Sequence, residues 1–561
     1  MIHLITHRPD AYKDIIDDKL ITLSDCVEFK LWYKKQTASN FDTETTVTEG
    51  LYSYKKSGPK SNRVFVLDEA GNKIPEQRKL LVAQIGSIDQ ETQFIFDNPL
   101  DDPKMTKVLK EYLEHEQEKY IHNALFDCSV SLFNLGVNPK NVRDTMLLSH
   151  ILHTGLDMPK GWHSYAGCLE RYLQREISKE EQTTFSEEPL TLSQIKYAAI
   201  DVLFPEQLYK AMYKDIEKWG LQNVATLENA VVRAYAHSMV DNFYLDIDKW
   251  KVNMAEQQLE LDTVREELYA YIKENFYEQC VTLGFILATE TYDFNWRSST
   301  KVKAIFSKLY PDMTASTKPE RVKYLASLEE NPHNRYLHLL NSGNTDVLEG
   351  LLISQHKELL IETGICKLPG VLEFNLNSND QTLAIFRLIK PDLVAVNKKA
   401  LSKIRHPLKT LFDRYNKAAK LVQSYGQNFI DQVNPDGMLR PPDYQQILQT
   451  GRTSMKLYQL LPGKNTYRNC FHYEPGWSVV SCDFASQEAV IAATVCKDEK
   501  MLKIFENNWD FHSYCASLLF PDEWKRLGGD PEPKDKPEDK LLVSRRNATK
   551  ATSFGDEILL K

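Results

Sequence analysis

The sequence lacks the features that mark secreted and membrane-anchored proteins. Its nine cysteines are scattered along 561 residues and form no Cys-x-x-Cys pair, which argues against a structural zinc and a disulfide framework. The first thirty residues contain no uninterrupted apolar run, so we expect neither a signal peptide nor a transmembrane helix. These absences predict a protein of the cytoplasm that does not contact a membrane.

An excess of positive charge is also absent. The chain has 69 Lys and Arg against 78 Asp and Glu, a net charge of −9, whereas contacts to nucleic-acid phosphates need cations. The total does not exclude such a ligand, because a metal-dependent site concentrates carboxylates locally while basic patches lie elsewhere. The chain is long and has 42% hydrophobic residues. This length and apolar content predict a globular protein of three or four domains.

The apolar residues change their periodicity along the chain. From Leu31 to Asp97, short apolar runs between polar turns predict strands. From Asp101 to Lys218, a helical period takes over. Strands followed by helices predict an α/β domain over residues 31–218, preceded by an N-terminal extension of residues 1–30.

Long helical segments with charged faces follow, and we assign residues 219–447 to a helical connector. This region contains an internal echo, in which residues 294–312 and 374–392 share Phe-Asn-x-x-Ser, Ala-Ile-Phe and Pro-Asp at equal offsets. Two unrelated amphipathic helices with similar N-caps would explain part of the echo, but the shared entry and exit favour a duplicated helical unit. Further on, WSVVSCDF predicts a buried strand and EAVIAATV the helix behind it.

Asp42 and Glu44 lie in FDTET, where the strand period of two places both carboxylates on one face. On its own this pattern is weak, because Asp-x-Glu is common on surface strands.

Two further segments strengthen the acidic pattern. Asn123 and Asp127 are four residues apart in IHNALFD, and Tyr197 and Asp201 repeat that spacing in YAAID, so each pair shares a helix face. The sequence therefore predicts that three acidic sites converge in one domain.

Phosphodiester cleavage by two metal ions explains these residue types. The ions need hard oxygen ligands, with one carboxylate bridging two cations about 3.5–4 Å apart. We expect Asp42 to be the bridge and Asp127 to hold the ion at the leaving oxygen. Glu44 and Asp201 then hold the ion that activates the attacking water. Tyr197, one turn before Asp201, orients that water.

The segments FDTET, HNALFD, DTMLLSHIL and YAAIDVLFPEQLY resemble, in this order, the motifs of the DEDDy 3′-5′ proofreading exonucleases. The resemblance covers residues 31–218 and implies a ribonuclease H-like fold with two Mg²⁺ or Mn²⁺ ions. It implies the same five functional residues, and it makes Asn123 a contact to the substrate strand. Asp144 matches a secondary acid of the family, or it is a helix N-cap.

Residues 448–555 resemble the thumb-to-palm region of family A, polymerase I-like DNA polymerases of the phage type. In LQTGRTSMKLYQLLPG the matching residues are Arg452, Gln459 and Pro462, which imply a grip on template and primer backbones. A surface turn is the alternative interpretation of this segment.

SCDFASQEAVIAA is similar to the first polymerase motif of that family. The resemblance implies that Asp483 binds the metals of the incoming dNTP and that Glu488 packs beneath its sugar. Val490 departs from the family, which has Arg there, whereas Asp510 and His512 agree with it.

RRNATKATSFG is similar to the second polymerase motif, a helix with Arg546, Lys550 and Phe554 on one face. The cations are expected to meet the triphosphate and the ring to stack near the new base. A solvated basic helix face is the alternative.

Past Gly555 the resemblance stops, and residues 556–561 match nothing in the family. The His-Asp-Glu motif that supplies the second polymerase carboxylate is not found, so we expect polymerisation to require a C-terminal fragment supplied in trans. The expected architecture is therefore an α/β exonuclease domain, a mainly helical thumb region and a partial polymerase palm with the start of the fingers.

The sequence thus predicts a family A DNA polymerase portion with a 3′-5′ exonuclease, acting on primer-template DNA and single-stranded 3′ ends. If the chain is phage-encoded, its location is the cytoplasm of the infected bacterium. Two alternatives remain, a stand-alone exonuclease and a non-catalytic DNA-binding subunit of a split polymerase.

Overall fold

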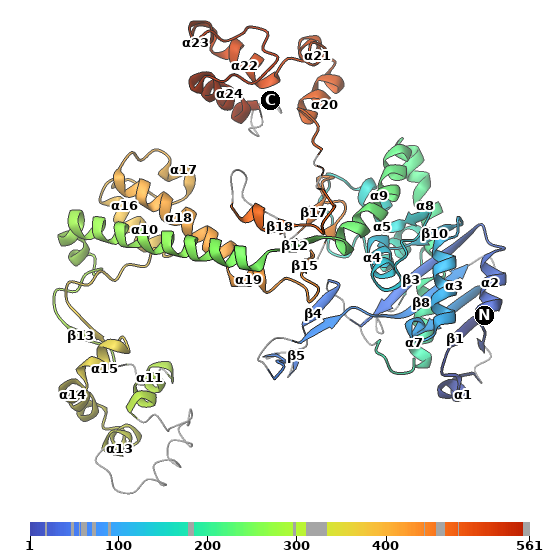
Figure 1. Ribbon diagram of the computed structural model, residues 1–561, viewed down its shortest axis with the longest axis horizontal. Helices are drawn as coiled ribbons and strands as arrows, with labels where there is room; N and C mark the ends of the chain where they lie inside the picture. The colour runs from blue at the N-terminus through green and yellow to red at the C-terminus, as the bar shows by residue number, and fades with distance from the viewer. Residues whose placement is uncertain are drawn as a thin grey trace. The chain divides into compact units, whose positions relative to one another are not determined.

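The computed structural model describes residues 1–553 except 17–19, 47–49, 55, 58–63, 70–73, 88–90, 178–184, 295–298, 310–333, 442–443, 456–465, 479 and 481. The chain divides into two compact units, Met1–Glu474 and Pro475–Lys561 (Figure 1). The two units are described separately below.

A seven-stranded mixed sheet forms the centre of the first unit, with the strand order β11-β10-β3-β8-β9-β1-β2. β3 pairs antiparallel with β8 and parallel with β10. The strands are β1 (Ile2–Thr6), β2 (Ile21–Leu23), β3 (Ala38–Thr45), β8 (Leu80–Ser87), β9 (Thr92–Asp97), β10 (Glu118–Ile121) and β11 (Val142–Asp144).

The predicted α/β architecture is confirmed for this part of the chain. β3, β8 and β9 lie where strand periodicity predicted them, and helices dominate after residue 101. The short strands β10 and β11 lie within the block that periodicity assigned to helices, because EKYI and VRD are too short and too charged to show an apolar alternation.

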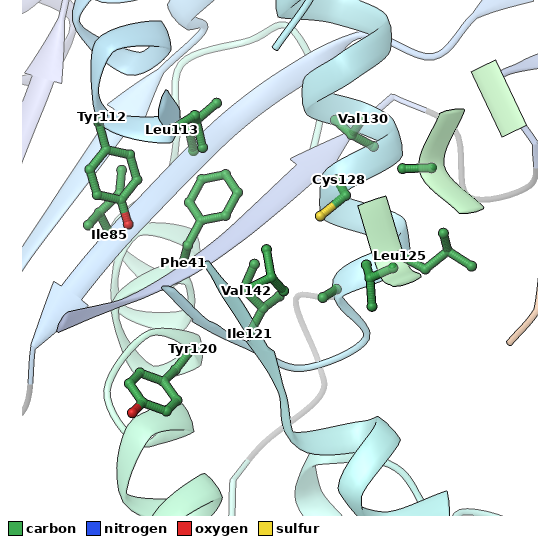
Figure 2. Close-up of a cluster of buried hydrophobic side chains, with 14 of the residues drawn as sticks. Phe41, Ile85, Tyr112, Leu113, Tyr120, Ile121, Leu125, Cys128, Val130 and Val142 are labelled. Carbon is green, nitrogen blue, oxygen red and sulfur yellow. The ribbon is translucent and has the colours of Figure 1, made fainter. Parts of the chain in front are cut away.

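Helices cover both faces of the sheet. Successive side chains of β3 point to opposite faces, so they contact both helical layers. Phe41 points into a core formed with α3 (Pro103–Glu114) and α4 (Ala124–Leu135), as Figure 2 shows. α7 (Leu192–Asp201) packs on the opposite face against β8 and β9. Asp42 and Glu44, which alternate with Phe41, therefore lie on the side of α7.

Residues 1–30, the predicted N-terminal extension, add β1 and β2 to this sheet, and α2 (Cys26–Tyr33) packs beside it. Asp97 at the end of β9 accepts hydrogen bonds from Arg8, Thr6 and Tyr12. The Tyr12 hydroxyl in turn accepts a hydrogen bond from the Leu190 N–H at 2.9 Å. The N-terminus is thereby tied to the segment that leads into α7.

The other elements of the first unit are mainly helical. α10 and α18 pack side by side around one core (Figure 1), and α11, α13, α14 and α15 surround a second core. The helices are α1 (Lys13–Ile16), α5 (Thr145–Leu152), α6 (Tyr165–Leu173), α8 (Pro205–Lys218), α9 (Gln222–Val240), α10 (Ile247–Thr282), α11 (Ser299–Leu309), α13 (Asn334–Ser342), α14 (Thr345–Gln355), α15 (Lys357–Glu362), α16 (Asn379–Arg387), α17 (Lys398–Leu401), α18 (Pro407–Ser424) and α19 (Gln427–Ile430). Small strands outside the main sheet are β4 (Tyr52–Tyr54), β5 (Lys56–Ser57), β6 (Val64–Phe65), β7 (Pro75–Gln77), β12 (Phe243–Leu245), β13 (Thr291–Tyr292), β14 (Cys366–Lys367), β15 (Met438–Leu439), β16 (Tyr444–Gln445), β17 (Ser454–Met455) and β18 (Phe471–His472).

The two copies of the internal echo both contain a helix, α11 and α16. Phe306 and Phe386 occupy equal offsets and are buried, the first in the core of α11 and α13–α15, the second in the core of α10, α16 and α18. The two side chains thus have equal roles in separate cores, and the duplication itself stays a prediction. Residues 295–298 of the first copy lie outside the described residues.

The second unit contains α20 (Gln487–Cys496), α21 (Glu499–Glu506), α22 (Phe511–Leu519), α23 (Pro521–Arg526) and α24 (Lys540–Ser553). The predicted helix EAVIAATV is confirmed as α20. The predicted buried strand WSVVSCDF is wrong, because its described residues form no strand and Trp477 and Val480 are 74% and 83% exposed. The described residues from 475 onward provide no other strand with which it could pair.

No helix in the described part of the chain combines the length and the apolarity needed to cross a membrane.

Candidate active site

Three carboxylates from two elements meet on the α7 side of the sheet. Asp42 and Glu44 come from β3, and Asp201 is the last residue of α7. One oxygen from each lies within 4.8 Å of the others, and all three residues are partly buried. The pairing of Asp42 with Glu44 on one face confirms the strand periodicity, and Asp201 joins them as predicted.

The end of α7 is fixed to β3 by Asn40 and by a close backbone approach. The Asn40 amide donates to the Val202 carbonyl at 3.0 Å and its Oδ1 accepts from the Glu206 N–H at 2.9 Å. A Cβ on Gly86 of β8 would lie 2.6 Å from the Val202 carbonyl oxygen. The backbone after Asp201 can therefore pack against β8 only because residue 86 has no side chain.

Asp127 is the fourth acid and approaches from α4. It is buried, and its Oδ1 accepts a hydrogen bond from Thr43 Oγ1 at 2.7 Å. It does not belong to the group whose oxygens lie within 4.8 Å, but its charge is close enough to raise the pKa of Asp42. The structure thus gathers all four predicted acids around one strand.

Burial and repulsion between the acids raise the pKa values of these carboxyl groups and so favour their protonated form. Burial, followed by repulsion from neighbouring acids, raises the pKa of Asp42 well above its ordinary range and that of Glu44 to about 9. Burial raises the pKa of Asp127 to about 8 and that of Asp201 to about 7. Such a cluster attracts cations, because a bound cation compensates the charge that water cannot solvate.

Tyr197 lies one turn before Asp201 on α7 and its hydroxyl is hydrogen-bonded to that carboxyl. Burial and the neighbouring acids raise its pKa, so the phenol stays protonated and able to donate. Tyr197 is therefore at the site, as predicted.

The prediction that Asn123 lies on the same helix as Asp127 is wrong. Asn123 precedes the first residue of α4 and has a left-handed backbone conformation, with a φ of 70°. Asp144 accepts the N–H groups of Asn123 and Ala124 at 3.1 and 2.8 Å and also caps α5 through Met146 and Leu147. Asp144 is therefore the N-cap of α5, which was one of its two predicted roles.

Three residues at the site were missed by the sequence analysis. Asn40 and Thr43 position Asp201 and Asp127, and Gln84 of β8 donates to Asp42 Oδ2 at 2.6 Å. Asn40 precedes the acidic motif and Thr43 lies inside it, between Asp42 and Glu44, so strand alternation was a usable signal for both residues. Gln84 had no such signal, because its place depends on the register between β3 and β8.

The expected polymerase residues of the second unit lie on different elements, as far as the structure describes them. Asp483 is exposed and lies outside helices and strands, and Glu488 is in the first turn of α20. Arg546 is buried and donates two hydrogen bonds to Asp510, at 2.7 and 2.8 Å. Among the described residues, the ion-pair partner of Arg546 is Asp510 rather than Asp483.

The Arg546–Asp510 pair is a strong interaction within this unit. Burial alone would raise the pKa of Asp510, but hydrogen bonds from Arg546 and Ser513 outweigh it and bring the pKa to about 2. The bidentate pair joins α24 to the start of α22.

The remaining expected residues are only partly described. Arg452 ends a tight turn, in which the Leu448 N–H donates to its carbonyl at 2.7 Å. Lys550 lies in α24, but its side chain is outside the described residues. Gln459, Pro462 and Phe554 also lie outside the described residues.

Comparison with known sequences finds a family match for two segments of the chain. Residues 352–531 match the family described as DNA polymerase family A, and residues 69–217 match the family described as 3′-5′ exonuclease. The match to the exonuclease family begins after Asp42 and Glu44. The position of these two acids in the site therefore rests on the geometry of the structure and not on the family match.

The relatives of this chain include proteins named DNA polymerase I and DNA polymerase. DNA polymerase I of Borreliella burgdorferi is 26% identical over 344 residues, 57% of this chain and 36% of that protein. The DNA polymerase of Escherichia phage T5 is 27% identical over 175 residues, 29% of this chain and 19% of that protein. DNA polymerase I of Aquifex aeolicus is 23% identical over 497 residues, 85% of this chain and 66% of that protein.

The chain spans only part of the length of each of these relatives. A solved structure of the POL domain of Pol1 from M. smegmatis in complex with DNA primer-template and dNTP is 17% identical, with a TM-score of 0.49 over 85% of this chain and 65% of that chain. The two family matches, the order of the motifs and the carboxylates on the seven-stranded sheet agree with one another. Residues 352–531 of this chain belong to the family A DNA polymerases, and residues 69–217 belong to a 3′-5′ exonuclease domain.

Proposed function

We propose that this chain removes nucleotides from the 3′ ends of DNA at the site formed by Asp42, Glu44, Asp127 and Asp201, with Mg²⁺ or Mn²⁺ as cofactor. The observation that carries the proposal is the meeting of three carboxylates from β3 and α7 within 4.8 Å. The fourth acid, Asp127, lies close enough to Asp42 to repel it.

The donor set fits two hard divalent cations. Every candidate ligand is a carboxylate oxygen, which is the donor type that Mg²⁺ and Mn²⁺ prefer. Bound cations of this kind supply an activated water and stabilise the negative charge that develops during phosphodiester hydrolysis.

The side chains of the site have separate tasks in this proposal. Asp42 is repelled by Asp127, Asp201 and Glu44 and would be the ligand shared by the two cations, which Glu44, Asp201 and Asp127 would also hold. Tyr197 orients the attacking water through its hydroxyl.

The hydrogen bond between Tyr197 and Asp201 holds the phenol at the edge of the acidic group. Asn123, in its left-handed conformation before α4, is available to contact the substrate strand.

Replacement of Asp42 by Asn tests this function because it removes a charge and keeps the shape. We expect Asp42→Asn to lose release of nucleotides from a 3′-labelled single strand, and chelator to silence the wild type. Asp157→Asn, an exposed acid of the same unit, is the control and should retain full activity. Near-normal nuclease activity of a folded Asp42→Asn protein would exclude this site.

We also propose that Asp483, Glu488, Arg546, Lys550 and Phe554 serve dNTP binding with Mg²⁺, and that Arg452 and Gln459 contact primer-template DNA. The support is the family A match over residues 352–531 together with the two polymerase motifs that follow in order. Binding of a fluorescent dNTP by the purified chain should weaken in Lys550→Ala. An unchanged affinity would exclude the nucleotide role of this lysine.

A further inference from the structure

Gln84 is the one residue with a polar side chain in the middle of an apolar strand. β8 reads LLVAQIGS, and every residue in it is buried. Gln84 is 0% exposed and pairs directly with Asp42 across the antiparallel ladder of β3 and β8. Directly opposed residues project to the same face of a sheet, so Gln84 and Asp42 point the same way.

One side-chain amide contacts two of the acids. Gln84 Nε2 lies 2.6 Å from Asp42 Oδ2, and the Gln84 side chain also hydrogen-bonds the side chain of Glu44. A carboxylate that binds a cation is ionised, so it accepts hydrogen bonds and cannot donate them, and beside bound cations the amide must present its N–H groups. A side-chain amide has two such protons, enough for one bond to each acid.

The other end of the amide has nothing to bond. Among the described residues, Gln84 Oε1 is buried without a hydrogen-bond partner. An unsatisfied buried carbonyl costs about 1–3 kcal/mol, whereas a leucine would fill the same place in this apolar strand without that cost. Folding alone therefore does not account for a glutamine at this position, and its contacts to the two acids do.

We infer that Gln84 is a positioning residue for the metal centre, which orients Asp42 and Glu44 by hydrogen bonds to their carboxyl groups and leaves their remaining oxygens for the cations. The inference rests on the proposed function of the same site. Hydrogen bonds from the surrounding protein fix the direction of a ligand's lone pairs and thereby raise its affinity for the metal.

The chain offers a matched control in Gln117. It is also a buried glutamine of the same sheet domain, its Nε2 donates one short hydrogen bond, to Ser39 Oγ at 2.7 Å, and its Oε1 is likewise without a partner. Ser39 is not an acid of the site. Replacing Gln117 by Leu should therefore disturb packing about as much as replacing Gln84, without touching the acids.

The first measurement is calorimetric binding of Mn²⁺ to the full chain. We expect Gln84→Leu to bind Mn²⁺ about 10–100-fold more weakly than the wild type, the usual cost of losing such a partner, and Gln117→Leu to bind it as the wild type does. Wild-type affinity in folded Gln84→Leu would overturn the inference. If Gln84→Leu does not fold, Gln84→Met has the same length and keeps the volume.

The second measurement separates positioning from direct ligation. In Gln84→Leu, release of nucleotides should need a higher Mn²⁺ concentration for half-maximal rate and should recover at excess Mn²⁺. Asp42→Asn should not recover. A Gln84→Leu defect that excess Mn²⁺ leaves unchanged would show that Gln84 does not act through the affinity for the metal.

The two proposals can fail separately. If the wild type binds Mn²⁺ but releases no nucleotide, the nuclease function is wrong, while the comparison of Mn²⁺ affinities still decides the role of Gln84. If nuclease activity is present and Mn²⁺ affinity is equal in Gln84→Leu and wild type, only the role of Gln84 is wrong.

Discussion

The carboxyl groups of the acidic cluster should make the free energy of unfolding of the metal-free protein fall as pH rises. Burial and repulsion raise the pKa of Glu44 to about 9 and that of Asp127 to about 8, whereas an unfolded carboxyl titrates near pH 4. Above pH ~4 the metal-free folded protein holds protons that the unfolded chain has lost. These groups therefore contribute stability at low pH, and that contribution is lost as pH rises through their folded pKa values.

Metal binding should reverse this dependence, because a cation binds the ionised carboxylates and removes their repulsion. We expect Mg²⁺ to raise the melting temperature more at pH 8.5 than at pH 6. Calorimetric scans with Mg²⁺ and with chelator at the two pH values measure the difference. A rise in melting temperature that is equal at both would mean that these carboxyls do not titrate together with metal binding.

Tyr197 differs from the acids because it contacts Asp201 without being a carboxylate itself. Tyr197→Phe should slow nucleotide release by about 10–10³-fold, the range of water positioning and proton transfer. Mn²⁺ affinity should stay at the wild-type value, and the loss of rate should persist at saturating Mn²⁺. A loss of Mn²⁺ affinity as large as that of Asp42→Asn would make Tyr197 part of the metal-binding set instead.

Between elements, the contact of β8 with the end of α7 is the tightest constraint on the site. A methyl group on Gly86 would meet the Val202 carbonyl at 2.6 Å, and Val202 follows Asp201 directly. Gly86→Ala should therefore destabilise the protein by about 1–3 kcal/mol, as overpacking does, and should lower nuclease activity by displacing Asp201.

Gly350 provides the contrasting substitution. It lies exposed in α14, and a Cβ there would have open space around it. Gly350→Ala should be neutral or stabilise by up to about 1 kcal/mol, because alanine favours a helix. Urea unfolding of both variants measures the difference, and equal effects would mean that the close approach at Gly86 is relaxed in solution.

Local periodicity also explains which elements were predictable from the sequence. The spacing in FDTET fixes a shared face within one strand, and the spacing in YAAID fixes one within a single helix, so Asp42, Glu44, Tyr197 and Asp201 were found. Gln84 depends on a strand register reached across a long intervening segment, which spacing cannot supply. WSVVSCDF failed for a related reason, because a strand needs a partner and apolar residues alone do not provide one.

Across the larger unit, the helix after the predicted exonuclease boundary belongs to the same core. Val232 and Met239 of α9 are buried with the residues of β3 and α4. Asn229 accepts the Asp144 N–H at 2.6 Å, and the Asn138 amide donates to the Arg233 carbonyl at 2.9 Å. The predicted boundary at residue 218 therefore separates segments that share one core.

Two truncated chains test how much of the molecule the exonuclease needs. A chain ending after Glu474 keeps the whole first unit, so it should retain Mn²⁺-dependent nucleotide release and its response to Asp42→Asn. A chain ending after Lys218 loses α9, and burial of a Val or Met side chain contributes ~1.5–3 kcal/mol each. We expect the shorter chain to be less stable by about 3 kcal/mol or more, seen as a lower urea midpoint, and to lose activity in proportion to its unfolded fraction. Equal midpoints for the two chains would mean that residues up to 218 form an independent core and that the contacts of α9 contribute little to it.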